Sequence, residues 1–195
     1  EDMAEQGVKE LILVAQETTV YGKDLYGKKS LHILLKKLCE IRGIRWIRIL
    51  YCYPEEIYDE LIEAIRDNEK VCHYIDMPIQ HINSDILKRM GRKTNREMLE
   101  KKIAALRAAI PDIAIRTTLI CGFPGENQVQ HEELLDFIEQ MQFDRLGAFP
   151  YSRQDHTPAA GFERQVPEET KLLWAEEVME LQQEVSAAKN ETFIG

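Results

Sequence analysis

A parallel α/β fold built from repeated strand–helix units is predicted by two features of this sequence, the composition of its apolar runs and the spacing between them. Nearly continuous apolar runs, typical of buried strands, begin near Leu11, Trp46, Cys72, Ile113 and Leu146. Their onsets lie 35, 26, 41 and 33 residues apart, the length of one strand followed by one helix. Because strands buried on both faces lack strict apolar–polar alternation, a parallel sheet with helices outside it is favoured.

Amphipathic helices are predicted between the strands, and a long helix after the last one. The segments with helical periodicity are residues 30–42, 54–68, 94–109, 129–141 and 167–190. Thr94 and Glu97 have the spacing of a capping box, in which each side chain binds a backbone N–H of the first turn. Pro54 and Pro167 suit first-turn positions. This pattern leaves open whether the sheet closes into a barrel or stays open and doubly wound.

The composition indicates one acidic globular domain. The 195 residues carry a formal charge of −9, and 44% of them are hydrophobic. Direct nucleic-acid binding is not expected, because phosphate neutralisation needs clustered Lys and Arg, and the one short basic run covers residues 87–96. No stretch approaches the roughly 20 apolar residues of a membrane helix, and the first residues do not resemble a signal peptide. A cytoplasmic protein without membrane contact is predicted.

The cysteines are predicted to be reduced thiols. Cys39, Cys52, Cys72 and Cys121 lie 13, 20 and 49 positions apart, and none of these intervals is a short metal-ligand spacing. No metal ligand is therefore assigned within the chain.

Polar segments follow the strands, where parallel α/β folds bind their ligands. Gly122 and Gly125 would let backbone amides approach a ligand closely, and Glu126 could accept a proton from a ribose hydroxyl or an amine. The same residues could equally form only a tight turn before the next helix. Gln80 and Ser84 offer neutral donors and acceptors after the third strand, but Ser84 or its neighbour Asn83 could simply cap a helix.

Two residue types in these segments have alternative interpretations. Arg116 lies inside an apolar run, and a buried guanidinium needs either an internal carboxylate or a ligand carboxylate. His81 and His156 lie at strand ends, yet a packing or surface role is favoured over metal ligation for every histidine.

Six segments, taken in order, resemble the radical S-adenosylmethionine (SAM) methylthiotransferases, and within them the branch that modifies a ribosomal protein. The segments read LVAQETTVYGKDLYG, LYCYPEE, YIDMPIQHINSDILKRMGRKT, RTTLICGFPGE, YSRQDHTPAA and MELQQEVSAAKNETFIG. RNA-modifying relatives typically have GQNVNSYG where this chain has AQETTVYG, and a Ser-Ser-His-Pro-like turn where it has YCYPEE. The resemblance covers nearly the whole chain.

This resemblance implies a (β/α) core that is usually an open barrel of six principal strands. Residues 1–195 would form a partial core domain containing strands two to six. The first strand with its Cys-x3-Cys-x2-Cys loop, a preceding cluster-bearing domain and a following TRAM-like β-barrel domain are expected to lie outside the chain. The chain alone is expected to be inactive, because the ligands of the 4Fe-4S clusters are missing from it.

The resemblance also implies which residues would surround SAM, although it assigns no catalytic residue. Gln16 and Thr18 would lie near the methionyl amine, Gln80 and Ser84 near the ribose, Arg116 at the methionine carboxylate, Gly122, Phe123, Gly125 and Glu126 near the adenosyl moiety, and Phe149 and Tyr151 beside the adenine.

The implied reaction is methylthiolation of a protein. In the complete enzyme, reductive cleavage of SAM yields a 5′-deoxyadenosyl radical that abstracts hydrogen from the β-carbon of an aspartate, and sulfur associated with the second cluster is inserted there as a methylthio group. The implied substrate is the small-subunit ribosomal protein S12, and an electron donor protein would reduce the clusters. The alternative is a complete α/β binding module or barrel enzyme without an iron–sulfur cluster, in which Glu126 acts with Asp155 or His156 in acid–base catalysis.

Overall fold

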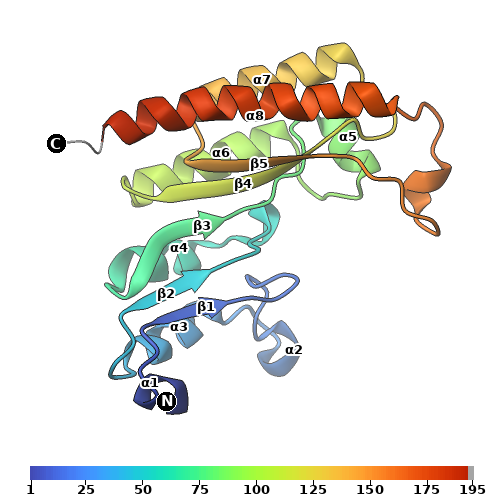
Figure 1. Ribbon diagram of the computed structural model, residues 1–195. Coiled ribbons are helices and arrows are strands. Elements are labelled where there is room, and N and C mark those ends of the chain that lie inside the picture. Colours follow the sequence, from blue (N-terminus) through green and yellow to red (C-terminus); the bar gives the residue numbers. More distant parts are fainter. Residues whose placement is uncertain (193–195) are drawn as a thin grey trace. The chain divides into compact units, whose positions relative to one another are not determined.

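The computed structural model describes residues 1–192 and contains the predicted alternation of strands and helices (Figure 1). The strands are β1 (Glu10–Leu13), β2 (Trp46–Ile49), β3 (Val71–Asp76), β4 (Ala114–Cys121) and β5 (Arg145–Pro150). The longer helices are α3 (Leu31–Cys39), α4 (Asp59–Asp67), α6 (Arg96–Ala109), α7 (Gln128–Met141) and α8 (Glu168–Glu191). Shorter helical segments are α1 (Asp2–Glu5), α2 (Lys23–Tyr26), η1 (Pro54–Glu56), α5 (Ser84–Arg89) and η2 (Pro158–Gly161). Each strand begins within one residue of its predicted onset.

The chain divides into two compact units, and each unit draws on two stretches of sequence. The first contains residues 1–78 and 102–115, and the second contains residues 79–101 and those from 116 onward. Strands β1 to β3 belong to the first unit, whereas β5 and most of β4 belong to the second. The polypeptide therefore passes from one unit to the other three times.

In the first unit, β1, β2 and β3 form a parallel sheet. β1 and β2 pair without interruption from Glu10 opposite Trp46 to Leu13 opposite Ile49, and the pairing of β2 with β3 shifts register between Ile47 and Ile49. Helices α3 and α4 connect the strands and pack against each other (Figure 1). The buried side chains of this core include Leu31, Leu35, Ile47, Leu61, Ile65 and Ile75.

In the second unit, β4 and β5 pair in parallel, and α7 provides the crossover between them. The long α8 packs along β5 and α7 (Figure 1). The core between these elements includes Leu134, Phe137, Ile138, Phe143 and Val178. Along β4, fully buried residues alternate with partly exposed ones, so only one face of this strand is completely covered.

The helix predicted over residues 54–68 is interrupted. Residues 54–56 form the 3-10 segment η1, Ile57 is extended, and α4 begins only at Asp59. The carbonyl oxygens of Glu56 and Ile57 accept hydrogen bonds from the ammonium groups of Lys29 and Lys102. The extended backbone of Ile57, with a ψ of 129°, ends the helical ladder, and the two lysines satisfy carbonyls that the interruption leaves without a helical donor.

The predicted capping box at Thr94 is wrong by one position. Helix α6 begins at Arg96, and it is the side-chain oxygen of Asn95 that accepts a hydrogen bond, 3.0 Å long, from the N–H of Met98. The hydroxyl of Thr94 is buried and has no hydrogen-bond partner among the described residues. Asn and Thr are both good N-cap residues, and burial of Thr94 leaves the role to Asn95.

This assignment predicts opposite outcomes for two neighbouring substitutions. Asn95→Ala should lower the free energy of unfolding by about 1 kcal/mol, because it removes the cap of α6. Thr94→Val should be neutral or slightly stabilising, because it removes a buried hydroxyl that lacks a partner while keeping the side-chain shape. Urea denaturation of the two variants measures both effects. A larger loss for Thr94→Val would restore the capping role to Thr94.

Candidate functional site

In the first unit, the segment after β1 is tied to the segment after β2. The N–H of Thr18 donates to the carbonyl of Tyr51, and its hydroxyl donates to the carbonyl of Leu50 at 2.6 Å. Gln16 is exposed to solvent, whereas Thr18 is 5% exposed. Of these two predicted site residues, Thr18 uses its N–H and hydroxyl in hydrogen bonds to the segment after β2, whereas the side chain of Gln16 is exposed to solvent.

Glu17 was not predicted as a site residue, yet its carboxylate organises this end of the sheet. It accepts hydrogen bonds from the N–H and the hydroxyl of Thr19 and, at 3.1 Å, from the N–H of Tyr53. Burial raises the pKa of the Glu17 carboxyl above its usual value, and these hydrogen bonds act in the opposite direction. The sequence feature that could have indicated this hydrogen-bonding role of Glu17 is a carboxylate followed by two threonines directly after a strand.

The segment after β2 contains a residue in an unusual backbone conformation. Tyr51 has a φ of 57°, which is in the left-handed region that non-glycine residues seldom adopt. The buried Asp76 at the end of β3 holds this turn: its carboxylate accepts from the N–H of Tyr51, and its carbonyl accepts from the N–H of Cys52. The three strand ends of the first unit are therefore connected through backbone and carboxylate hydrogen bonds.

In the second unit, Gln80 also adopts a left-handed conformation, with a φ of 69°. It nevertheless bonds to β4 as a strand residue would, since its N–H donates to Thr118 and its carbonyl accepts from Ile120. Asn83 caps α5, with its side-chain oxygen accepting from the N–H groups of the next turn. Ser84 is the exposed first residue of α5, so Asn83 performs the capping that the sequence left open between them.

The glycine turn after β4 is closed by its own carboxylate. One oxygen of Glu126 accepts hydrogen bonds from the N–H of Gly122 at 2.7 Å and from the N–H of Phe123 at 3.0 Å. Glu126 is 6% exposed. The N–H of Gly125 donates to the carbonyl of Arg164, so the amides that the sequence suggested for ligand contact are occupied, and the carboxylate of Glu126 faces inward.

Both glycines of the turn have a left-handed conformation, and each has a close neighbour. Gly122 and Gly125 have φ values of 75° and 90°. A Cβ on Gly122 would lie 2.9 Å from the Cβ of Lys171, and one on Gly125 would lie 2.6 Å from the guanidinium carbon of Arg89. At Gly122 the neighbours are the stem and backbone of Lys171, so a side chain does not fit, whereas at Gly125 the neighbour is the flexible end of Arg89 and the positive φ is what favours glycine.

The three aromatic residues of the predicted site, Phe149 and Tyr151 beside the adenine and Phe123 near the adenosyl moiety, differ in their surroundings. Phe123 and Tyr151 make an edge-to-face contact with ring centroids 5.2 Å apart, and both are buried. The hydroxyl of Tyr151 has no hydrogen-bond partner among residues 1–192. Phe149, in contrast, is 56% exposed. The structure brings Phe123 and Tyr151 together and leaves Phe149 open to solvent.

Arg116 is not fully buried, contrary to the expectation from its apolar neighbours. It lies on the partly exposed face of β4, which alternates with the covered face that carries Thr117 and Leu119. The regular alternation along β4 explains the difference, because an apolar run need not be covered on both sides. The side chain of Arg116 can therefore reach solvent or a ligand.

The cysteines are free thiols, as predicted. Cys52 and Cys121 are buried, whereas Cys39 and Cys72 are partly exposed. Burial raises the pKa of Cys121 to about 12, so this thiol stays protonated at neutral pH and is a poor ligand or nucleophile. Within residues 1–192, no group of three or more His, Cys, Asp or Glu side chains is arranged to hold a metal ion.

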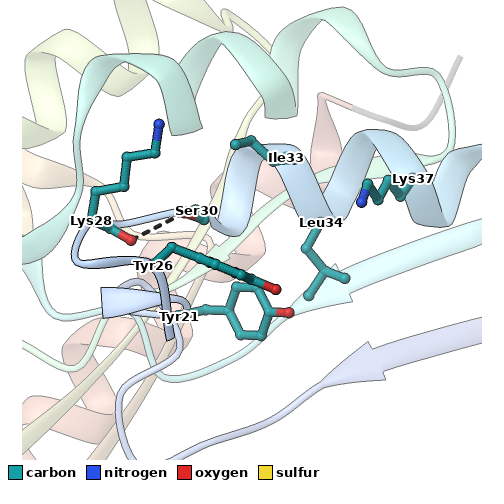
Figure 2. A pocket seen from close by; sticks show the side chains of 7 residues that line it. All are labelled: Tyr21, Tyr26, Lys28, Ser30, Ile33, Leu34 and Lys37. Atoms are coloured by element: carbon teal, nitrogen blue, oxygen red, sulfur yellow. Dashed lines mark hydrogen bonds between the residues drawn. The ribbon is translucent and has the colours of Figure 1, made fainter. Parts of the chain in front are cut away.

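The first unit contains a cavity of about 320 Å³ beside α2 and α3 (Figure 2). Figure 2 shows the rings of Tyr21 and Tyr26 opposite Ile33 and Leu34. No predicted site residue lines this cavity. A second cavity, of about 610 Å³, is lined in part by Glu17 and Thr18, so space for a ligand exists at the end of β1.

None of the helices in the described part of the chain is long and apolar enough to cross a membrane.

Comparison with known proteins identifies the family. The family model described as Radical SAM superfamily matches residues 1–138. This chain belongs to the radical SAM superfamily. Two solved structures share its fold. The radical SAM enzyme coproporphyrinogen III oxidase (HemN) from Escherichia coli has a TM-score of 0.63 and 20% identity, and the match covers 80% of this chain and 36% of that one. The radical SAM methyltransferase TsrM from Kitasatospora setae has a TM-score of 0.61 and 16% identity, and the match covers 78% of this chain and 29% of that one. The predicted parallel (β/α) fold of the radical SAM core is confirmed.

Curated relatives are much closer in sequence. The ribosomal protein uS12 methylthiotransferase RimO of Lachnoclostridium phytofermentans is 56% identical over 193 residues, which are 99% of this radical SAM chain and 44% of the relative. The RimO protein of Clostridium perfringens is 55% identical over 193 residues, 99% of this chain and 43% of the relative. The chain thus spans less than half the length of these relatives.

Proposed function

We propose that this radical SAM chain is the core portion of a methylthiotransferase that inserts a methylthio group at the β-carbon of an aspartate in ribosomal protein uS12. The observation that carries the proposal is the 56% identity, which extends over 99% of the chain, to a relative named for that activity. The complete protein would require an electron donor protein. Residues 1–195 supply a partial core domain, and by themselves they are expected to be inactive.

We propose that SAM binds at the carboxyl ends of the strands. The second unit offers a turn without side chains at Gly122 and Gly125, two packed aromatic rings, and the buried hydroxyl of Tyr151, which lacks a partner in the described part of the chain. A polar ligand group that met this hydroxyl would remove the cost of burying it unpaired. These features fit a nucleoside. When bound, SAM and 4Fe-4S clusters supply the radical chemistry, and cluster ligands are proposed to come from the rest of the complete protein.

The proposed roles of the site residues come from the family resemblance. Phe149 and Tyr151 would contact the adenine, and Gly122, Phe123, Gly125 and Glu126 would lie near the adenosyl moiety. Gln80 and Ser84 would lie along the ribose, and Arg116 would bind the methionine carboxylate, for which a guanidinium provides a two-donor fork. Gln16 and Thr18, which belong to the first unit, are proposed to contact the methionyl amine, and Thr18 lines the second cavity of that unit. The role of all these residues is to bind and orient the ligand and to exclude water.

Substitution of Arg116 in the full-length, cluster-loaded enzyme tests this site. Arg116→Ala should weaken SAM binding about tenfold, the loss expected when a charge-assisted hydrogen bond is removed. Arg145→Ala is the matched control, because Arg145 lies opposite Arg116 on β5 and is exposed. Titration calorimetry measures both affinities. Equal affinities for the two variants would remove Arg116 from the site.

The activity has a direct test as well. The full-length enzyme, given SAM, a reductant, sulfide as a sulfur source and uS12, should add a methylthio group to uS12 that mass spectrometry detects on an aspartate. Residues 1–195 under the same conditions should give no product. Absence of product from a full-length enzyme that contains its clusters and binds SAM would refute the proposed reaction.

A further inference from the structure

A buried histidine lies beside the glycine turn of the second unit and has no role in the function proposed above. His81 is 0% exposed and follows Gln80 in the segment after β3. Its Nδ1 atom lies 3.0 Å from the backbone N–H of Asn83. Because a backbone N–H can only donate, Nδ1 must be the acceptor, and the ring proton of the neutral imidazole is on Nε2.

The Nε2 atom of His81 faces the carboxylate that closes the turn. It lies 3.2 Å from Oε1 of Glu126, with both side chains fully buried. Neither atom has a well-aligned hydrogen-bond partner in residues 1–192, and the contact between them is close without being aligned as a hydrogen bond. Two buried polar atoms of complementary character at this distance interact with each other, since leaving either without a partner is costly.

These contacts form a continuous connection between two strand ends. The amide of Asn83 orients His81, His81 faces one oxygen of Glu126, and the other oxygen of Glu126 holds the amides of Gly122 and Phe123. The connection is entirely inside the second unit. It fixes the turn after β4 relative to the segment after β3, which contains Gln80.

We propose that His81 is a positioning residue: its neutral imidazole fixes the side-chain conformation of Glu126, and thereby holds the Gly122–Glu126 turn in the shape that receives the nucleoside part of SAM. The statement about SAM rests on the proposed function. The statement about the turn does not, because it depends only on contacts within the chain. The two statements therefore have separate tests.

Two amide side chains imitate the two halves of the imidazole. In His81→Gln, the side-chain NH2 can take the place of Nε2 and donate to Glu126. In His81→Asn, the side-chain oxygen can take the place of Nδ1 and accept from Asn83, but nothing reaches Glu126. If Glu126 is held by His81, the glutamine variant should preserve the turn and the asparagine variant should not. His156→Asn, at an exposed position, is the control.

Nuclear magnetic resonance of residues 1–195 tests the turn. The long-range ¹⁵N–¹H spectrum should show His81 as the neutral Nε2–H tautomer. Hydrogen exchange of the Gly122 and Phe123 amides should become about tenfold faster in His81→Asn, and should stay near the parent rate in His81→Gln and His156→Asn. An Nδ1–H tautomer, or unchanged exchange in a folded His81→Asn, would overturn the positioning role.

Calorimetry on the full-length, cluster-loaded enzyme tests the link to SAM. His81→Asn should weaken SAM binding about fivefold to tenfold, and His81→Gln should restore most of it. Faster exchange in His81→Asn with unchanged SAM affinity would keep the positioning role and refute the placement of SAM at this turn. Equal loss of SAM affinity in both variants would refute the proposal, because the contact of His81 with Glu126 would then not contribute to SAM binding.

Discussion

Replacing Gly122 with alanine is expected to lower the free energy of unfolding by about 3 kcal/mol. Its φ of 75° costs a residue with a Cβ about 1–2 kcal/mol, and crowding adds about 1–3 kcal/mol. The crowding comes from Lys171, which is 2% exposed and whose Cβ would lie 2.9 Å from the new methyl group. The lysine cannot easily move aside, since its Cα is also only 3.2 Å from that position. Chemical denaturation measures the loss.

The same substitution at Gly91 separates conformational strain from crowding. Gly91 has the same φ of 75°, but nothing lies within 4 Å of the place where its Cβ would be. Gly91→Ala should therefore cost only about 1 kcal/mol, the strain term. If Gly91→Ala and Gly122→Ala lose equal stability, the packing of Lys171 against the turn is not what requires a glycine.

Replacing Glu126 with alanine should also cost about 3 kcal/mol. The variant would leave the buried amides of Gly122 and Phe123 without an acceptor and His81 without the carboxylate that it faces. Each buried donor that loses its partner costs about 1–3 kcal/mol, and relaxation of the turn recovers part of the sum. Denaturation gives the stability, and exchange of the two amides shows whether the loss arises in the turn.

Glu139→Ala is the control for Glu126→Ala, since Glu139 is an exposed carboxylate on α7. It should change the free energy of unfolding by less than about 0.5 kcal/mol. A Glu126→Ala variant as stable as this control, with slow exchange at Gly122 and Phe123, would show that the turn does not depend on its carboxylate.

The strands of this protein were predictable because buried parallel strands leave a strong signal. Each apolar run is bounded by polar or glycine-containing segments, and the onset of each observed strand lies within one residue of its prediction. Errors arose where tertiary contacts overrode local patterns. Lysines from other segments bind the carbonyls of Glu56 and Ile57, and α4 begins only at Asp59, after the extended Ile57. Thr94 is buried, and Asn95 caps α6 in its place.

The candidate site was predictable in location but less so in detail. Polar strand ends indicated where ligands would bind, yet the sequence could not show that the carboxylate of Glu126 turns back onto its own loop. That orientation depends on His81, 45 positions earlier in the chain, and a contact over this separation has no local signature. The half-exposed position of Arg116 likewise depends on which face of β4 the rest of the protein covers.

The interleaving of the two units in sequence has a consequence for synthesis. The first unit cannot be completed until residue 115 has been translated, although residues 79–101, which belong to the second, have by then already been synthesised. That stretch must wait for residues from 116 onward before it acquires its neighbours, including the partner of His81. During this interval the nascent chain exposes apolar side chains such as Ile82, Ile86 and Leu87, which are buried in the finished fold and which a chaperone can bind.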